Sequence, residues 1–352
     1  MYVCDLLTLF SITVGNISSH LNLISKLGPA KAANALKVLS SYYWSRFSHQ
    51  PRASGLPFSM SIEPTTSCNL RCPECPSGLR SFTRNTGMID LELYRETIDQ
   101  VKDHLIYLLL YFQGEPYLHK NFFDLVEYAS SKKIFTSTST NAHYLNDANA
   151  RATIESGLDR LIISIDGTSQ DTYEQYRVGG LLQKVIDGTE NLVYWKRKLK
   201  SETPHLMFQY LVVKPNEHQL NDVEVLAKKL GVDEVRFKTA QIYDYENGSP
   251  LIPDNPKYSR YRKNSDGTFS IKNTLDNHCW KMWHSCVITW DGQVIPCCFD
   301  KDASHTMGDL KKSSFKEIWQ GKKYQQFRSA VLRSRSEIEI CKNCSEGTKV
   351  WA

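Results

Sequence analysis

Residues 63–78 read EPTTSCNLRCPECPSG and place Cys68, Cys72 and Cys75 within eight residues of one another. The stretch directly follows a predicted strand, residues 58–64, so the three thiols should lie on a loop at the carboxyl end of that strand. In barrel-like sheets, this end of the strands carries the chemistry. Three thiolates can hold a four-iron cluster and leave one iron open to another ligand.

From residue 58 onward, short apolar runs alternate with longer amphipathic runs. Because strands joined by helical crossovers pair in parallel, this pattern predicts an α/β domain with a six-stranded parallel sheet. Six strands are too few for a closed eight-stranded barrel and suit an open, partial barrel, but the periodicity alone would suit a doubly wound sheet equally well. The predicted strands are residues 58–64, 105–113, 134–140, 160–166, 206–213 and 234–239. The predicted helices are residues 89–103, 121–132, 147–156, 169–198 as one helix or two, and 217–230.

The segments that flank this core differ from it in composition. Residues 1–54 show helical spacing, which ends at prolines and a glycine, and predict a helical N-terminal segment. Residues 244–278 are rich in turn-forming residues and predict a linker or covering loop. Residues 279–352 contain cysteines, tryptophans and the hairpin signal Asp291-Gly292 between apolar residues, so they predict a second, small domain.

The composition is that of a globular chain: of 352 residues, 41% are hydrophobic and 23% charged, and the net charge is +5. This mild excess does not require nucleic acid as a partner. The apolar run of residues 3–14 contains Asp5 and is too short to cross a bilayer, which takes about 20 apolar residues. We therefore expect no transmembrane segment, a buried helix face for this run, and a buried Cys4.

Seven of the ten cysteines lie in tight groups, which is typical of metal or cluster ligands in a reducing compartment. A cytoplasmic location follows as an expectation. One alternative for the first group is a zinc ribbon that joins Cys72 and Cys75 to Cys341 and Cys344, although it would leave Cys68 unused.

The spacing Cx3Cx2C after the first strand of a repeated βα domain resembles the radical S-adenosylmethionine (radical SAM) enzymes. The resemblance implies a partial (β/α)6 TIM-like barrel over residues 55–243 and a [4Fe-4S] cluster on Cys68, Cys72 and Cys75. It further implies that SAM chelates the open iron and is cleaved reductively to a 5′-deoxyadenosyl radical that abstracts hydrogen from a substrate. One departure is Glu74, which stands where the family usually has an aromatic residue near the adenine.

The resemblance also suggests a binding site for SAM at the ends of strands two to four. Residues 113–116, QGEP, resemble the family's GGEP motif, in which backbone carbonyls and the Glu carboxylate accept from the amino group of SAM. Short polar residues after the next two strands suit the ribose and the carboxylate of SAM, and an arginine beyond them could clamp a carboxylate. The expected contacts are Gly114, Glu115, Pro116, Thr140, Asn141, Ser164, Asp166 and Arg177.

The C-terminal cysteines resemble those of the SPASM/twitch domains that follow many radical SAM cores. The resemblance covers about residues 279–346 and implies one auxiliary [4Fe-4S] cluster held by Cys279, Cys297, Cys341 and Cys344. Cys286 and Cys298 are alternatives for two of these places, and zinc is an alternative to the cluster.

We therefore expect a radical SAM oxidoreductase or maturase with two [4Fe-4S] clusters. The substrate would be a peptide, a protein or a small molecule, and a flavodoxin or ferredoxin would supply electrons. Two alternatives are a non-catalytic zinc or iron–sulfur scaffold and an RNA-modifying radical SAM enzyme. The net charge is only mildly positive and the sequence shows no added RNA-binding module, so the RNA-modifying alternative ranks low.

Overall fold

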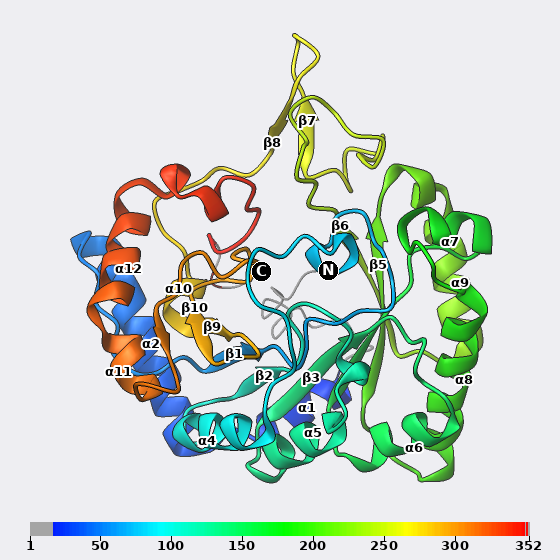
Figure 1. The fold of residues 1–352 in the computed structure, drawn as a ribbon, viewed down its shortest axis with the longest axis horizontal. Coiled ribbons are helices and arrows are strands. Elements are labelled where there is room, and N and C mark those ends of the chain that lie inside the picture. The colour runs from blue at the N-terminus through cyan, green and yellow to red at the C-terminus, as the bar shows by residue number, and fades with distance from the viewer. Residues whose placement is uncertain (1–16, 349, 351–352) are drawn as a thin grey trace.

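The computed structural model describes residues 17–348 and residue 350 (Figure 1). The apolar run of residues 3–14 and Cys4 lie outside the described residues, so what the sequence suggests for them stays a prediction. Within the described part of the chain, no helix has both the length and the apolar character needed to cross a membrane.

A nine-stranded sheet forms the centre of the molecule, in the order β11-β10-β9-β1-β2-β3-β4-β5-β6. Strands β1 to β6 pair in parallel, each with the next along the chain. The long crossover helices all lie on the outer face of this curved sheet (Figure 1), whereas a doubly wound sheet carries such helices on both faces. The prediction of an open, partial (β/α)6 barrel is therefore confirmed. The six strands are Ser59–Ile62, Tyr107–Leu109, Phe135–Thr140, Arg160–Ser164, His205–Val212 and Glu234–Thr239.

The crossover helices pack their apolar faces against the sheet. Helix α4, for example, begins after Asp90, whose side chain accepts from two backbone amides, and buries Tyr94, Ile98 and Val101. The predicted run 169–198 forms two helices, which the residues around Gly179 and Gly180 separate. The helices of the barrel are α3 (Pro76–Leu79), α4 (Leu91–Val101), α5 (Phe122–Ser131), α6 (Asp147–Glu155), α7 (Gln170–Tyr176), α8 (Leu182–Lys198) and α9 (Leu220–Leu230), with 3-10 helices η3 (Pro116–Leu118) and η4 (Lys214–Gln219).

The linker is more ordered than its composition predicts. Strands β7 (Tyr261–Lys263) and β8 (Phe269–Ile271) form an antiparallel pair of their own, which projects above the barrel in Figure 1. The ring of Tyr261 is buried and stacks on Tyr245, with ring centroids 4.5 Å apart. Aromatic stacking between distant positions leaves no local periodicity, so the sequence pattern missed this element.

The C-terminal segment continues the barrel sheet instead of forming a sheet of its own. Strand β9 (Ser285–Ile288) pairs in parallel with the full length of β1, and the predicted hairpin joins it to β10 (Gln293–Ile295). After the short strand β11 (Gly308–Asp309), the chain packs as helices on the outer side of this part of the sheet (Figure 1). These helices are α11 (Phe315–Gln320) and α12 (Lys322–Ser334), followed by η5 (Arg335–Glu337) and η6 (Glu339–Cys341), whereas the short helix α10 (Lys281–His284) precedes β9.

The same C-terminal segment also reaches the opposite edge of the barrel. The side chain of Asn343 donates to the backbone oxygen of Ile242, just beyond β6, at 2.7 Å, and accepts from the Tyr261 hydroxyl at 2.9 Å. The segment thus touches the chain at both edge strands, β1 and β6. The open side of the partial barrel is bridged in this way.

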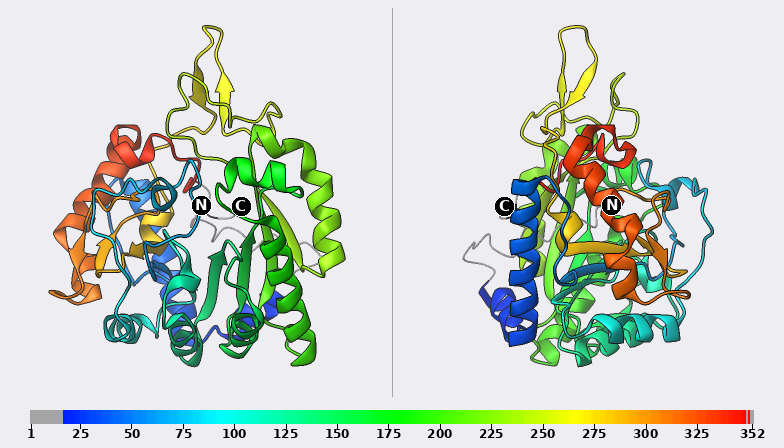
Figure 2. Two further views of the ribbon diagram at one scale, coloured as in Figure 1. Left: turned by 45° about the vertical axis from the view of Figure 1, so that its right-hand side comes forward. Right: turned by 90° about the vertical axis from the view of Figure 1, so that its left-hand side faces the viewer.

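Helices α1 (Ile17–Ser25) and α2 (Pro29–Ser48) confirm the helical prediction for the described part of the N-terminal segment. Helix α2 runs along the C-terminal segment at the edge of the molecule (Figure 2). Its Tyr42 is fully buried, lies 5.0 Å from the Trp280 ring, and contacts His278 Nδ1 through its hydroxyl at 3.0 Å. The Trp283 ring also packs against the Tyr42 ring, with ring centroids 5.4 Å apart.

A buried ion pair joins the loop after the three clustered cysteines to the C-terminal segment. Both guanidinium ends of Arg84 donate to the carboxylate of Glu63, at 2.8 and 2.6 Å, at the end of β1. Glu63 also accepts from the backbone amide of Trp290, and Arg84 donates to the backbone oxygen of Lys301. Burial raises the pKa of Glu63, while the hydrogen bonds and charge of Arg84 oppose that rise.

We predict that Arg84→Met lowers the free energy of unfolding by about 3 kcal/mol or more, because it leaves the Glu63 charge buried without its partner. Urea unfolding measures the loss. This loss of stability should become smaller as the pH falls, because the folded variant then binds a proton at Glu63. Burial raises the pKa of Glu63 above its value in the unfolded chain. Adding Glu63→Gln should recover part of the stability, and a double variant no more stable than Arg84→Met would contradict this account.

Candidate active site

The loop with the three clustered cysteines crosses the carboxyl end of the barrel strands and ends in helix α3. Gly78, in that helix, packs directly on the loop: a Cβ there would come within 2.6 Å of both the backbone nitrogen and the backbone oxygen of Cys72. Arg80 donates to the backbone oxygen of Cys68 at 2.6 Å. The loop is therefore folded back on itself, and its conformation depends on a glycine at position 78.

Each thiol of this loop has one polar side-chain neighbour from a different part of the barrel. The amide of Asn141 lies 3.9 Å from Cys68 Sγ, Arg177 Nη1 lies 3.9 Å from Cys72 Sγ, and Gln113 Oε1 lies 3.9 Å from Cys75 Sγ. These neighbours follow β3, α7 and β2, respectively. Two strand ends and the end of α7 thus converge on the three sulfur atoms.

Burial sets the proton affinity of these thiols. It raises the pKa of Cys68 to about 12 and that of Cys72 above its ordinary value, although the charge of Arg177 opposes the shift at Cys72. A metal or cluster would therefore have to displace protons when it binds here, as thiolate ligands always require. In the part of the chain that the structure describes, no three Cys, His, Asp or Glu side chains close around one point as they would around a single metal ion.

Gly114 lies against the backbone of the cysteine loop. It adopts a positive φ of 74°, and a Cβ would come within 2.3 Å of the Thr65 backbone oxygen. Its amide donates to the hydroxyl of Ser77, and the next amide, that of Glu115, donates to the Ser67 backbone oxygen at 2.7 Å. Two hydrogen bonds, one to each side of the three cysteines in the chain, thus hold the QGEP turn against the cysteine loop.

The carboxylate of Glu115 joins the ends of β2 and β3. Its Oε1 accepts from the Thr140 hydroxyl at 2.7 Å and from the Tyr117 amide at 3.3 Å, and its Oε2 accepts from the Asn141 amide at 2.8 Å. Pro116 follows as the first residue of η3. Full burial raises the pKa of Glu115 to about 7, against the effect of these donors.

Asp166 and Arg177 form a fully buried ion pair, at 2.5 Å between Oδ2 and Nε. The other carboxylate oxygen of Asp166 accepts from the Leu211 amide on β5 at 2.7 Å. The sequence suggests separate contacts with a ligand for these two residues, but the structure pairs them with each other. Ser164 is buried at the end of β4, and its hydroxyl lies 3.4 Å from that of Ser139 on β3.

Glu74 stands where the radical SAM enzymes usually have an aromatic residue, and it contacts the chain beyond β6. Its carboxylate accepts from the Tyr243 amide at 3.0 Å, and the Tyr243 hydroxyl accepts from Lys301 Nζ at 2.9 Å. Lys301 belongs to the C-terminal segment and is itself buried. This row of side chains therefore links the cysteine loop, the end of the barrel and the C-terminal segment.

The C-terminal cysteines fall into two groups. Cys279, Cys297, Cys341 and Cys344, the four that the sequence suggests for an auxiliary cluster, line one cavity. Cys286 lies on β9 and, with Cys298, lines a second cavity of similar size, which shares Lys281 and Cys297 with the first. The geometry thus brings together the four expected thiols and places the two rival cysteines apart from them.

The remaining wall of the four-cysteine cavity combines apolar and charged side chains, and two of the charged ones, Lys281 and Glu346, pair with each other at 3.3 Å. Its apolar side chains are Met282, Phe327, Val331 and Ile340. Arg335 Nη2 lies 3.2 Å from Cys344 Sγ, and the same guanidinium donates to the His278 backbone oxygen. Gly347 completes the cradle, because a Cβ there would come within 2.4 Å of Cys279 Sγ. Four thiols, a cation and a glycine at the sulfur fit a cubane cluster.

Several of these neighbours carry no signal in the sequence. Gln113, Tyr243, Lys301 and Arg335 come from four separate segments, and only the fold brings them to the cysteines. Of these four residues, only Gln113 could have been identified from the sequence, because it occupies the first position of the QGEP motif. Arg335, six residues before Cys341, has no spacing that would set it apart from other arginines.

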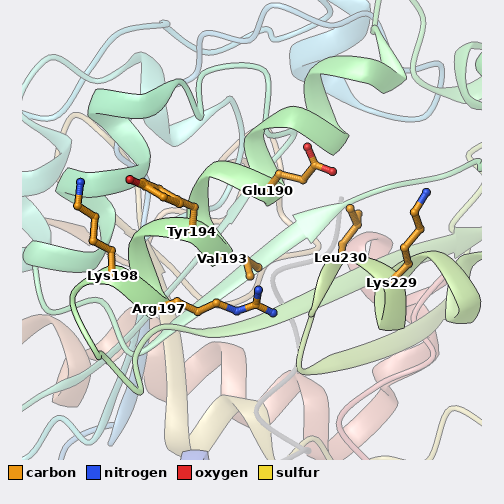
Figure 3. A pocket seen from close by; sticks show the side chains of 7 residues that line it. All are labelled: Glu190, Val193, Tyr194, Arg197, Lys198, Lys229 and Leu230. Atoms are coloured by element: carbon orange, nitrogen blue, oxygen red, sulfur yellow. The ribbon is translucent and has the colours of Figure 1, made fainter.

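A separate hollow lies on the outer surface between α8 and α9 (Figure 3). Its lining includes Tyr194, Arg197, Lys198 and Lys229, which come from the helix layer on the far side of the strands from the barrel interior. None of the cysteines lines it. The basic run of residues 195–200 is thus part of an outer helix face, and the candidate site stays at the strand ends.

Comparison with known proteins agrees with the positions of both sites. Residues 62–193 match the radical SAM superfamily, and residues 279–345 match the SPASM iron–sulfur cluster-binding domain. A cofactor-modifying protein for tungsten-containing aldehyde ferredoxin oxidoreductase from Pyrococcus furiosus is 24% identical, over 81% of this chain and 86% of its own. PqqA peptide cyclase from Rhodopseudomonas palustris is 23% identical, over 75% of this chain and 74% of its own. The solved structure of Streptococcus suis SuiB bound to precursor peptide SuiA shares the fold, with a TM-score of 0.60 at 13% identity over 88% of this chain and 75% of that one.

We predict that Gly114→Ala destabilises the protein more than Gly179→Ala does. Both glycines have a positive φ, so each substitution costs about 1–2 kcal/mol of backbone strain, but only at Gly114 does the added carbon meet backbone. Thermal unfolding should therefore show at least about 2 kcal/mol of further loss for Gly114→Ala. Equal losses in the two variants would show that the close approach of Gly114 to Thr65 has no energetic importance.

Proposed function

Because the chain belongs to the radical SAM superfamily and carries a C-terminal SPASM-type domain, we propose that it cleaves SAM reductively and abstracts a hydrogen atom from its substrate. The observation that carries the proposal is the arrangement around the cysteine loop, where Asn141, Arg177 and Gln113 each reach one of the three sulfur atoms. A [4Fe-4S] cluster on Cys68, Cys72 and Cys75 would supply the electron that splits SAM into methionine and a 5′-deoxyadenosyl radical.

The strand ends around the loop offer contacts for each polar part of SAM. Of the roughly four lone-pair positions of the Glu115 carboxylate, three are occupied by donors of the described chain, which leaves one on Oε2 for the ammonium group. Gly114 and Pro116 shape the turn beside it. We assign the remaining expected contacts, with ribose and carboxylate, to the side chains of Thr140, Asn141 and Ser164.

Asp166 and Arg177 play a different part in this proposal. Since Asp166 holds one edge of the guanidinium, it fixes the direction in which the other nitrogens of Arg177 point, toward Cys72. Arg177 can then offer charge both to the cysteine sulfur and to the carboxylate of SAM. Asp166 is a positioning residue, whereas Arg177 contacts the ligand.

We propose that Cys279, Cys297, Cys341 and Cys344 hold one auxiliary [4Fe-4S] cluster. Four thiolates leave no iron open, so such a cluster would exchange electrons and would not bind substrate directly. The row of Glu74, Tyr243 and Lys301, of which Lys301 is buried, lies between the chain segments of the two cysteine sites. A substrate radical formed in this region could pass its electron to the auxiliary cluster, which makes the overall change a two-electron oxidation.

For the substrate, we propose a peptide or a segment of a partner protein. Support comes from two similar proteins whose names state peptide substrates, PqqA peptide cyclase and SuiB with its precursor peptide SuiA. A small molecule is the second candidate, since a solved structure with a TM-score of 0.51 holds SAM and a compound named 2-DOIA. A reduced flavodoxin or ferredoxin would supply the electron.

The first experiment measures iron, sulfide and zinc in the anaerobically reconstituted chain and then assays 5′-deoxyadenosine after SAM and a reductant are added. We expect about eight irons per chain from two four-iron clusters. Cys72→Ala should lose about four irons and all deoxyadenosine formation, whereas Cys297→Ala should lose about four irons and still cleave SAM.

Cys286→Ala is the matched control for these variants, because Cys286 is buried in the same segment but lies outside the four-cysteine cavity. It should keep both the iron content and the cleavage of SAM. A loss of about four irons in this control would assign Cys286 as a ligand. Zinc without sulfide, and no cleavage of SAM, would reject the proposal in favour of a non-catalytic scaffold.

A further inference from the structure

The helical N-terminal segment exposes an unusual number of large apolar side chains. Seven of the fifteen exposed large hydrophobic residues in the described part of the chain lie between residues 21 and 47. Phe47 is 84% exposed and Leu36 is 66% exposed. Scattered exposed apolar residues are normal on a protein surface, but a contiguous group of this kind marks an interaction site. The seven are Leu21, Ile24, Leu27, Leu36, Tyr43, Trp44 and Phe47.

Four of them lie on one face of α2, which also includes the exposed Ser40. Leu36, Tyr43, Trp44 and Phe47 are spaced by seven, one and three residues, so they share one face of the helix. We call this face the apolar stripe. Helix α2 stands at the outer edge of the molecule, with the rest of the protein on its opposite side (Figure 2).

The face of α2 that packs against the protein is largely polar. Lys31, Asn34, Ser41 and Ser45 are buried there, and Lys31 Nζ donates to the Lys133 backbone oxygen at 2.6 Å. A surface helix normally packs its apolar side against the core and turns its polar side to water. Val38 and Tyr42 supply the apolar contacts of that inward face, so α2 carries apolar side chains on both faces, and packing within the described fold does not use the apolar stripe.

The charges around the apolar stripe are all of one sign. Lys37 and Arg46 are exposed at its two edges, Lys37 beside Trp44 and Arg46 beside Tyr43 on the helical wheel. Over residues 1–62 the sequence has five Lys and Arg but a single acid, Asp5. This segment thus contributes four of the five net positive charges of the whole chain.

We propose that α2 docks on a lipid surface that carries anionic headgroups, with its axis in the plane of that surface. Twenty residues give the helix a length of about 30 Å, and aromatic residues such as Tyr and Trp are favoured at the boundary between headgroups and acyl chains. Apolar residues on one side and flanking lysine and arginine are the features of helices that lie in this boundary.

Charge argues against a second copy of the chain as the occupant. A symmetric contact through the apolar stripe would bring Lys37 and Arg46 of one copy close to those of the other, with no acid in α2 to pair with them. An anionic surface, in contrast, complements both edges of the apolar stripe.

The test is flotation of the full-length, reconstituted chain with vesicles made of equal parts of phosphatidylglycerol and phosphatidylcholine. We expect the protein to float with these vesicles and to bind vesicles of phosphatidylcholine alone much more weakly, and we expect added salt to release it. Trp44→Ser with Phe47→Ser should weaken binding about tenfold or more, because both side chains leave water on docking. Lys37→Glu with Arg46→Glu should weaken binding to the anionic vesicles several-fold.

Val225→Ser is the matched control, because Val225 is 68% exposed on α9, across the molecule from α2 (Figure 1). It should bind vesicles as the unchanged chain does. The proposal is overturned if the unchanged chain stays unbound with anionic vesicles, or if the Trp44 and Phe47 variant binds equally well. A dimer in sedimentation that this variant dissociates, without vesicle binding, would reassign the apolar stripe to a second copy.

Discussion

The unpaired edge of β1 is the constraint on which the arrangement of this protein depends. A partial barrel leaves two strand edges with free backbone donors and acceptors, and such edges must be covered. Here β9 pairs with β1 along its whole length, and Asn343 anchors the same C-terminal segment beside β6. The strand pairing that covers the edge of β1 therefore also places the second group of cysteines beside the barrel, while β6 remains the last strand of the sheet.

This arrangement explains why the links between the two cysteine sites are polar and buried. Arg84 pairs with Glu63 at the end of β1 and donates to the backbone of Lys301, whose side chain contacts Tyr243. Buried charges of this kind contribute less to stability than to a single, well-defined geometry. A site that handles a radical needs such geometry, since a reacting atom must be held at a fixed distance from the group that attacks it.

The interior of the barrel is polar where the chemistry would take place. Strand β3 reads FTSTST and is buried throughout, and two of its hydroxyl groups donate to neighbouring segments: Thr138 donates to the Leu110 backbone oxygen and Thr140 to Glu115. An apolar interior would be more stable but could not position a charged, polar ligand such as SAM. The apolar packing lies instead between the sheet and the outer helices.

The sequence by itself determined the strand and helix order, both cysteine groups and the QGEP turn, while the choice of a barrel came from the cysteine motif's resemblance to a known family. Each of these depends on residues that are near one another in the chain, so periodicity and spacing report them directly. Only the tertiary structure decided that Asp166 pairs with Arg177, that Cys286 stands apart from the four-cysteine cavity, that β9 extends the barrel sheet, and that α2 exposes its apolar stripe. These features depend on which surfaces meet when distant segments pack, and local sequence pattern does not carry that information.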